Sequence, residues 1–137
     1  MATNVRRVQY FYATVRGEPD EAFAVLSHLA AQGVNLLALN SLPIGPDSTQ
    51  FTLFPEEPAR LVETSRAAGL ALDGPHHALL VQGDDELGIL ARLHKRLHHS
   101  GIEVYASNAV TDGHGYFGYV LYVRAADAER AAAAIGD

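Results

Sequence analysis

Three consecutive acids, Asp84, Asp85 and Glu86, stand just before Gly88 at the junction of an expected strand and an expected helix. Such a loop presents unpaired backbone N–H groups and the positive end of a helix, and both suit a carboxylate. A glycine lets a ligand approach where a Cβ would intrude, and the acids could accept hydrogen bonds from an ammonium group. This combination predicts a site for an amino acid. The acids also repel a ligand carboxylate, so they favour a ligand with a basic or amide side chain.

The same residues also have a purely structural interpretation. Asp84 or Asp85 can cap the helix, and Gly88 can ease close packing at its start. The two roles are compatible, so the loop remains a candidate site.

Histidine is the other residue type that could do chemistry here. Among the seven histidines, His94 and His98 lie one helical turn apart, a spacing that can hold a metal. No third ligand is evident, and no Glu stands between them in a metalloprotease motif. We therefore expect no metal site.

Motifs for nucleophilic catalysis are missing from the sequence. It contains no cysteine, no Gly-x-Ser-x-Gly and no phosphate-binding Gly-x-x-x-x-Gly-Lys. The run Asp112-Gly113-His114-Gly115 is typical of a hairpin turn. We expect no catalytic residue and no cofactor.

Composition narrows the class of protein. Of the 137 residues 48% are hydrophobic and 19% charged, as in a chain with a packed core. The net charge of −6 argues against nucleic acid as a partner. The start Met1-Ala-Thr-Asn lacks an apolar signal core, and no apolar run is long enough for a membrane span. We expect a cytoplasmic protein that binds neither nucleic acid nor membranes.

The chain nearly repeats itself at an offset of 68 residues. Gly33 aligns with Gly101 (101 − 33 = 68), and other pairs follow without a gap: Leu29 and Leu97, Asn40 and Asn108, Gly45 and Gly113, Phe51 and Tyr119, Leu53 and Leu121. The repeat predicts two modules that act together, residues 1–75 and 76–137. His94 aligns with Leu26, a core-facing position, so we expect it to be packed and partly buried. His98 and His99 align with alanines on an expected solvated face.

Each module shows the element order of one α+β unit. In the first, strands are expected at Val8–Val15, Val34–Leu42, Gln50–Phe54 and Leu70–Leu72, with one helix ending at Gly33 and another at Pro58–Ala68. In the second, strands are expected at Ala78–Gln82, Ile102–Thr111 and Tyr116–Val123, with helices at Glu86–His99 and Ala125–Ile135. Asp73-Gly74-Pro75 is the expected joint.

The order βαββαβ is the ferredoxin-like arrangement, an antiparallel sheet with both helices on one face. The second module stops after its second helix and so lacks its last strand. That would leave Ala78–Gln82 as a bare apolar edge, covered by Leu70–Leu72 or by a second subunit. Twofold pairing of such edges predicts a homodimer.

The stretch from Leu79 to Leu90 resembles the strand–loop–helix segment of ACT domains, which are small regulatory modules that bind amino acids. Asp85 and Gly88 match the loop of that family, and Gly33-Val34-Asn35-Leu36 matches its helix exit. The likeness covers the chain as two tandem copies. It departs from the pattern at three positions: Asp20 replaces a glycine, Leu87 a proline, and Glu103 the equivalent of Asn35.

The resemblance implies a site in which the loop of one module faces the second strand of the other. The residues it implies are Gly83, Asp84, Asp85, Leu87, Gly88 and Ile89 of the loop, with Asn35, Leu36, Leu37 and Asn40 of the strand. The asparagines could equally serve turns or strand ends. Because the two copies differ, two equivalent sites are not expected.

The function that follows is a non-catalytic regulatory protein that binds an amino acid or a similar metabolite and acts on an enzyme of amino-acid metabolism. Two alternatives stay open. Ferredoxin-like α+β barrel monooxygenases pair two such modules, and a closed pocket lined by His and Tyr would favour that class. A purely dimerising module with degenerate sites is the other.

Overall fold

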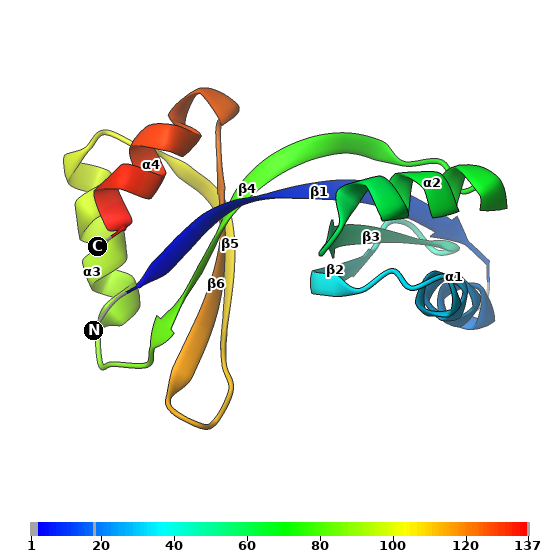
Figure 1. Ribbon diagram of the computed structural model, residues 1–137, viewed down its shortest axis with the longest axis horizontal. Coiled ribbons are helices and arrows are strands. Elements are labelled where there is room, and N and C mark those ends of the chain that lie inside the picture. Colours follow the sequence, from blue (N-terminus) through cyan, green and yellow to red (C-terminus); the bar gives the residue numbers. More distant parts are fainter. Residues whose placement is uncertain (1–2, 18, 137) are drawn as a thin grey trace. The chain divides into compact units, whose positions relative to one another are not determined.

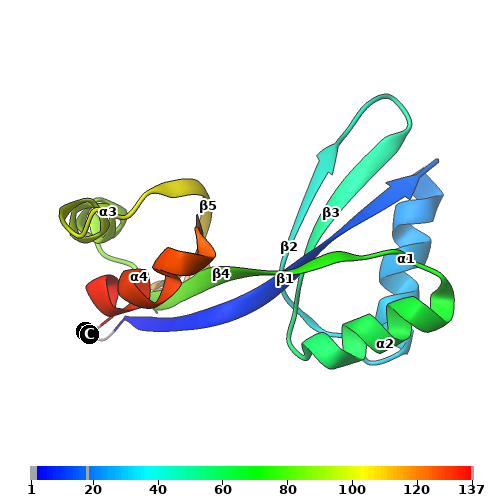
Figure 2. The same ribbon diagram turned by 90° about the horizontal axis from the view of Figure 1, so that it is seen from above.

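The computed structural model describes residues 3–17 and 19–136, and Figures 1 and 2 show its two views. In this part of the chain the fold is α+β, with six strands and four α-helices. The elements in chain order are β1 (Asn4–Arg16), α1 (Pro19–Ala31), β2 (Leu36–Pro43), β3 (Ser48–Pro55), α2 (Pro58–Ala68), β4 (Asp73–Asp84), α3 (Ile89–His99), β5 (Val104–Thr111), β6 (Tyr116–Val123), the 3-10 turn η1 (Ala125–Asp127) and α4 (Ala128–Ile135).

The chain forms two compact units. The first unit is Gln9–His76, and the second combines the chain before Gln9 with the chain from His77 onward. His77 follows Gln9 by 68 residues, the period of the repeat. The expected boundary at 75/76 lies one residue from this division, whereas residues 1–8, expected in the first module, belong to the second unit.

The strands are hydrogen-bonded in the order β2-β3-β1-β4-β6-β5. In the first unit β3 pairs antiparallel with β1 and β2, and in the second unit β6 pairs antiparallel with β4 and β5. The two outer hairpins have the same register 68 positions apart: Leu36 faces Pro55, and Val104 faces Val123. Each hairpin also has a register shift at equivalent positions, between Leu36 and Ala38 in the first unit and between Val104 and Ala106 in the second.

Each unit has its own hydrophobic core between sheet and helices. In the first, alternate residues of β1 and β3 pack against Leu29 of α1 and Leu61 of α2. In the second, alternate residues of β4 and β6 pack against Leu93 and Leu97 of α3 and Ile135 of α4. Figure 2 shows α1 and α2 on the same side of β1, β2 and β3. The expected ferredoxin-like pattern, with helices on one face of each sheet, is confirmed.

Most expected elements are present. The helix Pro58–Ala68 and the strand Tyr116–Val123 have the expected bounds, and Gly69 ends α2 with φ 73°. In the turn after β5 the Asp112 carboxylate accepts hydrogen bonds from the amides of His114 (2.6 Å) and Tyr116 (3.2 Å), which confirms the hairpin.

The expected strand Leu70–Leu72 and the joint Asp73-Gly74-Pro75 are wrong. Residues 70–72 form no strand, and the segment taken for a joint is the start of β4, which runs to Asp84. A Cβ on Gly74 would lie 2.9 Å from the carbonyl oxygen of Tyr10. Glycine is therefore required because the backbones of β4 and β1 approach closely here, and not because the chain breaks between modules.

The bare edge expected at Ala78–Gln82 is also wrong. No strand follows α4 among the described residues, as expected. However, β4 has β1 as its other neighbour, and in the second unit this is the segment before Gln9. Val5 packs against the core of that unit. The start of β1 therefore covers the edge of β4 in the second unit. This edge was expected to be covered by Leu70–Leu72 or by a second subunit.

Candidate functional site

The candidate loop Gly83–Ile89 lies wholly in the second unit and runs from the last two residues of β4 to the first residue of α3. The Asp85 amide donates to the carbonyl of Gly115 (2.8 Å), which ties the loop to the turn before β6. The Ile89 amide donates to the Glu86 carbonyl (3.1 Å). These bonds make residues 85–88 a turn, so α3 begins at Ile89 and not at Glu86 as expected.

Gly88 occupies the N-cap position of α3 with φ 78° and ψ 12°. Only glycine adopts this left-handed conformation without strain. A Cβ built there meets nothing within 4 Å, so the space in front of the residue is open. Gly88 thus sets the direction in which the chain enters the helix and leaves the approach to its first turn clear.

Capping of α3 by Asp84 or Asp85, the structural interpretation, is not seen: within the described chain neither carboxylate bonds to the first turn. The amides of Leu90 and Ala91 likewise have no hydrogen-bond acceptor in that part of the chain. Unpaired amides at the positive end of a helix attract anions. The loop therefore offers donors at its helix end and carboxylates at its strand end.

Arg92 is a residue of the candidate site that sequence reasoning missed. Its guanidinium donates to the Glu86 carboxylate (2.8 Å) and to the carbonyl of Leu87 (3.2 Å), so it holds the loop from the first turn of α3. Glu86 and Arg92 are six positions apart, a spacing at which side chains on one continuous helix do not meet. The pair becomes recognisable only when α3 is known to start at Ile89.

Three hollows surround the loop within the second unit. An open one of about 490 Å³ follows residues 85–91. An apolar one of about 180 Å³ lies between Ile89, Leu90 and the end of β5 at Val110. A smaller one of about 140 Å³ is polar and is lined by Asp84, Glu86, Arg92 and Arg96 among others. The Leu87 side chain is 100% exposed beside them.

The strand residues of the candidate site lie in the first unit. Leu36 begins β2, Leu37 lies at its irregularity, and Asn40 is opposite Thr52 of β3. The side-chain amide of Asn35 donates to the Glu56 carboxylate (3.0 Å), while the Glu56 amide donates to the Asn35 carbonyl (2.9 Å). Asn35 therefore has a structural role, joining the exit of α1 to the end of β3.

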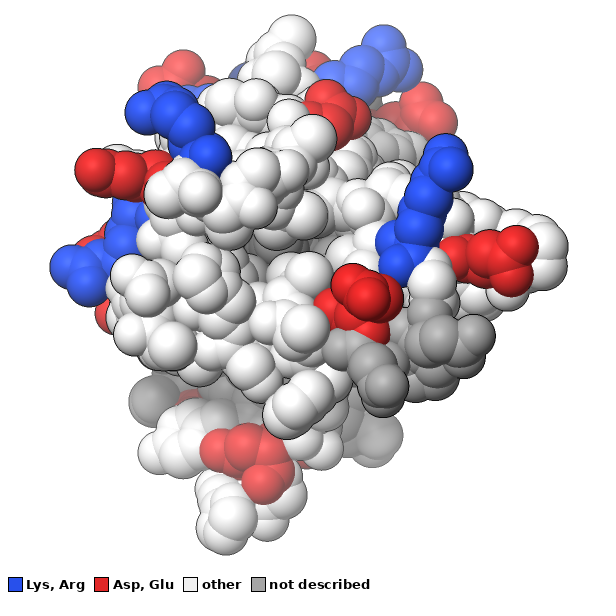
Figure 3. All heavy atoms as spheres, turned by 90° about the vertical axis from the view of Figure 1, so that its right-hand side faces the viewer, with Lys and Arg blue, Asp and Glu red and all other residues white. Residues whose placement is uncertain are grey.

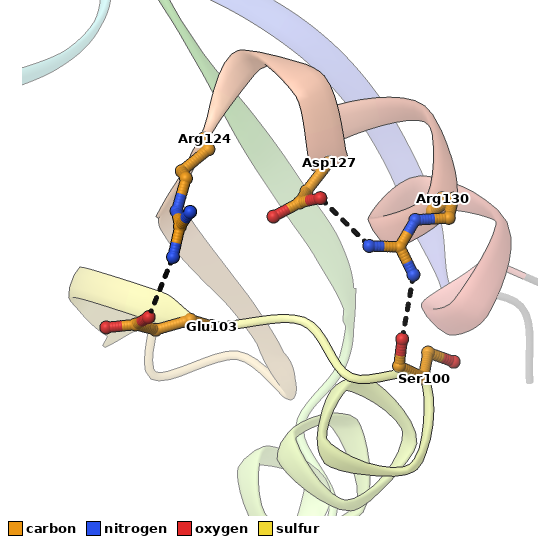
Figure 4. A network of polar contacts seen from close by, with 5 residues as sticks. All are labelled: Ser100, Glu103, Arg124, Asp127 and Arg130. Carbon is orange, nitrogen blue, oxygen red and sulfur yellow. Dashed lines mark hydrogen bonds and ion pairs between the residues drawn. The ribbon is translucent and has the colours of Figure 1, made fainter.

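The same contact occurs one period later with different chemistry. Glu103 and Arg124 stand 68 positions after Asn35 and Glu56, and the Arg124 guanidinium donates to the Glu103 carboxylate (3.1 Å; Figure 4). Arg130 extends the network by donating to Asp127 (2.9 Å) and to the carbonyl of Ser100 (2.8 Å). The departure of Glu103 from the family pattern is thus explained by a local ion pair.

The structure brings the expected site residues together in two groups. Gly83 to Ile89 form one loop in the second unit, and Asn35 to Asn40 form the start of one strand in the first. The two groups belong to different units, so a site that combines them stays a prediction.

The three histidines of α3 differ in burial and in their contacts. The Nε2 of His94 is 2.5 Å from the hydroxyl oxygen of Tyr119, and His94 is partly buried, as expected. His98 and His99 are exposed, also as expected, with ring centroids 6.1 Å apart. In the described ranges no three His, Asp or Glu side chains are grouped as a metal would need. None of the helices described there has both the length and the apolar character to cross a membrane.

No protein-family model and no curated protein match the sequence. Solved structures do. One is protein BT0572 from Bacteroides thetaiotaomicron, 13% identical over 94% of this chain and 88% of that chain, with a TM-score of 0.81. Another is the regulatory subunit of aspartate kinase from Thermus thermophilus, 14% identical over 98% and 95%, with a TM-score of 0.69. A third is that subunit from Thermus flavus, 16% identical over 98% and 95%, with a TM-score of 0.59. At such identities the likeness establishes the fold, and the tandem ACT-type fold expected from the sequence is confirmed.

Proposed function

We propose that this protein is a non-catalytic regulatory protein, acting in the cytoplasm, whose loop Gly83–Ile89 binds an amino acid or a similar small metabolite. The observation that carries the proposal is the start of α3. There the amides of Leu90 and Ala91 are unpaired within the described chain, and the space beside Gly88 is open. Arg92 holds the loop in place through its hydrogen bond to the Leu87 carbonyl. A site whose donors are fixed before binding loses little entropy when a ligand arrives.

The charges of the loop determine which ligand it would accept. A ligand carboxylate would bind at the amides of the first turn of α3, and an ammonium group at Asp84 or Asp85. The guanidinium of Arg92 partly offsets the acids by pairing with Glu86 at 2.8 Å. The remaining acidic charge favours an amino acid with a basic or amide side chain.

The regulatory part of the proposal rests on the fold. Two of the similar structures are described as regulatory subunits of aspartate kinase. We propose by analogy that ligand binding in this protein is communicated to an enzyme of amino-acid metabolism. The exposed side chains of Leu87, in the loop, and Val110, beside it, would change their surroundings on such binding.

A thermal-shift screen against the common amino acids tests the proposal. A ligand present at a hundred times its dissociation constant should add about 2.7 kcal/mol to the free energy of unfolding. A basic or amide amino acid should give the largest rise. Absence of stabilisation by every amino acid at millimolar concentration would remove the binding function. An Asn40→Ala variant then tests whether β2 contributes, because its ligand affinity should fall if the strand belongs to the site.

A further inference from the structure

A further hollow lies in the first unit, which does not contain the loop Gly83–Ile89. It has a volume of about 260 Å³ and is formed between α1 and the end of α2. Its lining includes Ala24, Val25, His28 and Leu29 of α1 and Ser65 and Ala68 of α2. On α1 these positions follow the helical repeat, so one face of the helix forms one wall.

The surface around this hollow is mostly uncharged. Among the residues that the structure describes, no Lys, Arg, Asp or Glu contributes to its wall. Figure 3 views the side of the structure on which α1 and α2 lie, and most of the charged side chains in that view lie toward its edges. An ionised ligand would lose its hydration here without a charged partner, which is unfavourable.

Ser65 is the exception to the apolar lining. The residue is 1% exposed, and its hydroxyl has no hydrogen-bond partner in the described part of the chain. A serine inside a helix usually bonds to the carbonyl four residues earlier, here that of Leu61. The backbone carbonyl of Ser65 accepts a hydrogen bond from the Leu70 amide at 2.9 Å. The side-chain hydroxyl makes no hydrogen bond within the described residues.

A buried hydroxyl without a partner is rare because it loses its bonds to water on folding. Alanine would fill the same place without that cost. The Ser65 hydroxyl, unpaired in the described part of the chain, is thus found in the wall of an apolar hollow, where a ligand could supply its hydrogen bond.

The size of the hollow limits the ligand further. An engineered apolar cavity of roughly 150 Å³ holds benzene, so about 260 Å³ accommodates a single six-membered ring with a small substituent. We infer that the hollow between α1 and α2 is a binding site for a small uncharged molecule, mainly apolar, whose single hydroxyl or carbonyl group bonds to Ser65. The inference is independent of the amino-acid site, because it concerns the first unit alone.

Phenol and toluene are the probes that test it, since they share the ring and differ in the hydroxyl. In amide NMR spectra, millimolar phenol should shift the signals of Val25, Leu29 and Ala68. Ser65→Ala should weaken phenol binding about five-fold, the loss of one hydrogen bond, and leave toluene binding unchanged. Equal phenol affinity in the variant would overturn the role of Ser65. Shifts confined to other residues, or none, would overturn the site.

A matched pair of variants separates filling of the hollow from a general effect on α2. Ala68→Leu places a larger side chain in the wall and should abolish binding of both probes. Ala67→Leu changes the neighbouring exposed position, which does not line the hollow, and should bind both as before. Unchanged binding in Ala68→Leu would place the ligand elsewhere. A dispersed amide spectrum for each variant checks that the fold is kept.

Discussion

Gly88 and Gly101 stand at the two ends of α3 and share a left-handed backbone, with φ of 78° and 70°. A Cβ at either position meets no atom within 4 Å, so substitution acts through backbone strain and not through a clash. Gly88→Ala and Gly101→Ala should each lower the free energy of unfolding by about 1–2 kcal/mol. Only Gly88→Ala should also weaken binding of the amino acid found in the thermal-shift screen.

Urea unfolding and ligand titration of both variants measure the two effects separately. Gly101→Ala serves as the control for strain at an end of the same helix. If both variants bound the ligand as tightly as the original protein, the approach past Gly88 would not be part of the site.

Arg92 contributes to order in the loop more than to global stability. Its pair with Glu86 is about half exposed (48% and 49%), a situation in which an ion pair adds little. Arg92→Ala should therefore leave the melting temperature nearly unchanged. It should speed hydrogen exchange at the amides of Asp85 and Ile89, which are hydrogen-bonded in the loop, and lower ligand affinity, because the loop is no longer held in its binding conformation.

Arg124→Ala is the matched control for this change. It removes a similar exposed pair, that with Glu103, from the same unit but away from the loop. Its exchange rates at the amides of Asp85 and Ile89 and its ligand affinity should equal those of the original protein. Loss of affinity in both variants would indicate a general effect of removing positive charge.

At the scale of elements, the two units share one plan with different side chains. The outer hairpins keep the same register, and the link from the helix exit to the end of the hairpin's second strand recurs as Asn35–Glu56 in one unit and Glu103–Arg124 in the other. A strand hairpin of this kind tolerates exchange of a surface pair because the backbone ladder sets its geometry. The two copies therefore share the backbone pairing of the hairpin and differ in the side chains that form this surface contact.

The start of β1 is the element whose removal should be most costly to the second unit. A variant that begins at Gln9 loses the segment that neighbours β4 in that unit and the packing of Val5 on its core. We expect a lower melting temperature and aggregation through the uncovered apolar strand. A variant that begins at Thr3 is the control and should melt like the full chain.

At the scale of the whole molecule, the oligomeric state remains a prediction. The bare edge at Ala78–Gln82, from which the sequence predicted a homodimer, is not present, because β4 lies between β1 and β6. The strands at the ends of the hydrogen-bonded order are β2 and β5, and β5 is uncharged and almost fully exposed. Such an edge invites pairing with a second copy of the chain. We expect light scattering at low micromolar concentration to give twice the 14.7 kDa of one chain.

A charge placed on this edge tests which strand is responsible. Val110 is 72% exposed on β5, and Val110→Lys should shift the protein to the monomer. Leu42→Lys, at 52% exposure on β2, should not. A monomer for the unchanged protein would show that β5 is tolerated as a free edge.

The sequence by itself determined the period of 68 residues, the βαββα order that both modules share and the presence of most elements, although most bounds differ by a few residues. These follow from local signals: the proline at the start of α2, the β-branched and aromatic run Tyr116–Val123, and glycines such as Gly69 that end helices. Gly88 could be recognised as special from its place between strand and helix. Local signals are reliable here because they act between residues close in the chain.

Only the tertiary structure decided which segments become partners. It assigned the start of β1 to the second unit, placed Gly74 within β4 where a Cβ would lie 2.9 Å from the Tyr10 carbonyl oxygen, and started α3 at Ile89 so that Arg92 reaches Glu86 and Leu87. It also left the Ser65 hydroxyl unpaired beside a hollow. Each of these depends on pairing or packing between residues far apart in the chain, and the pattern of neighbouring residues carries no information about that.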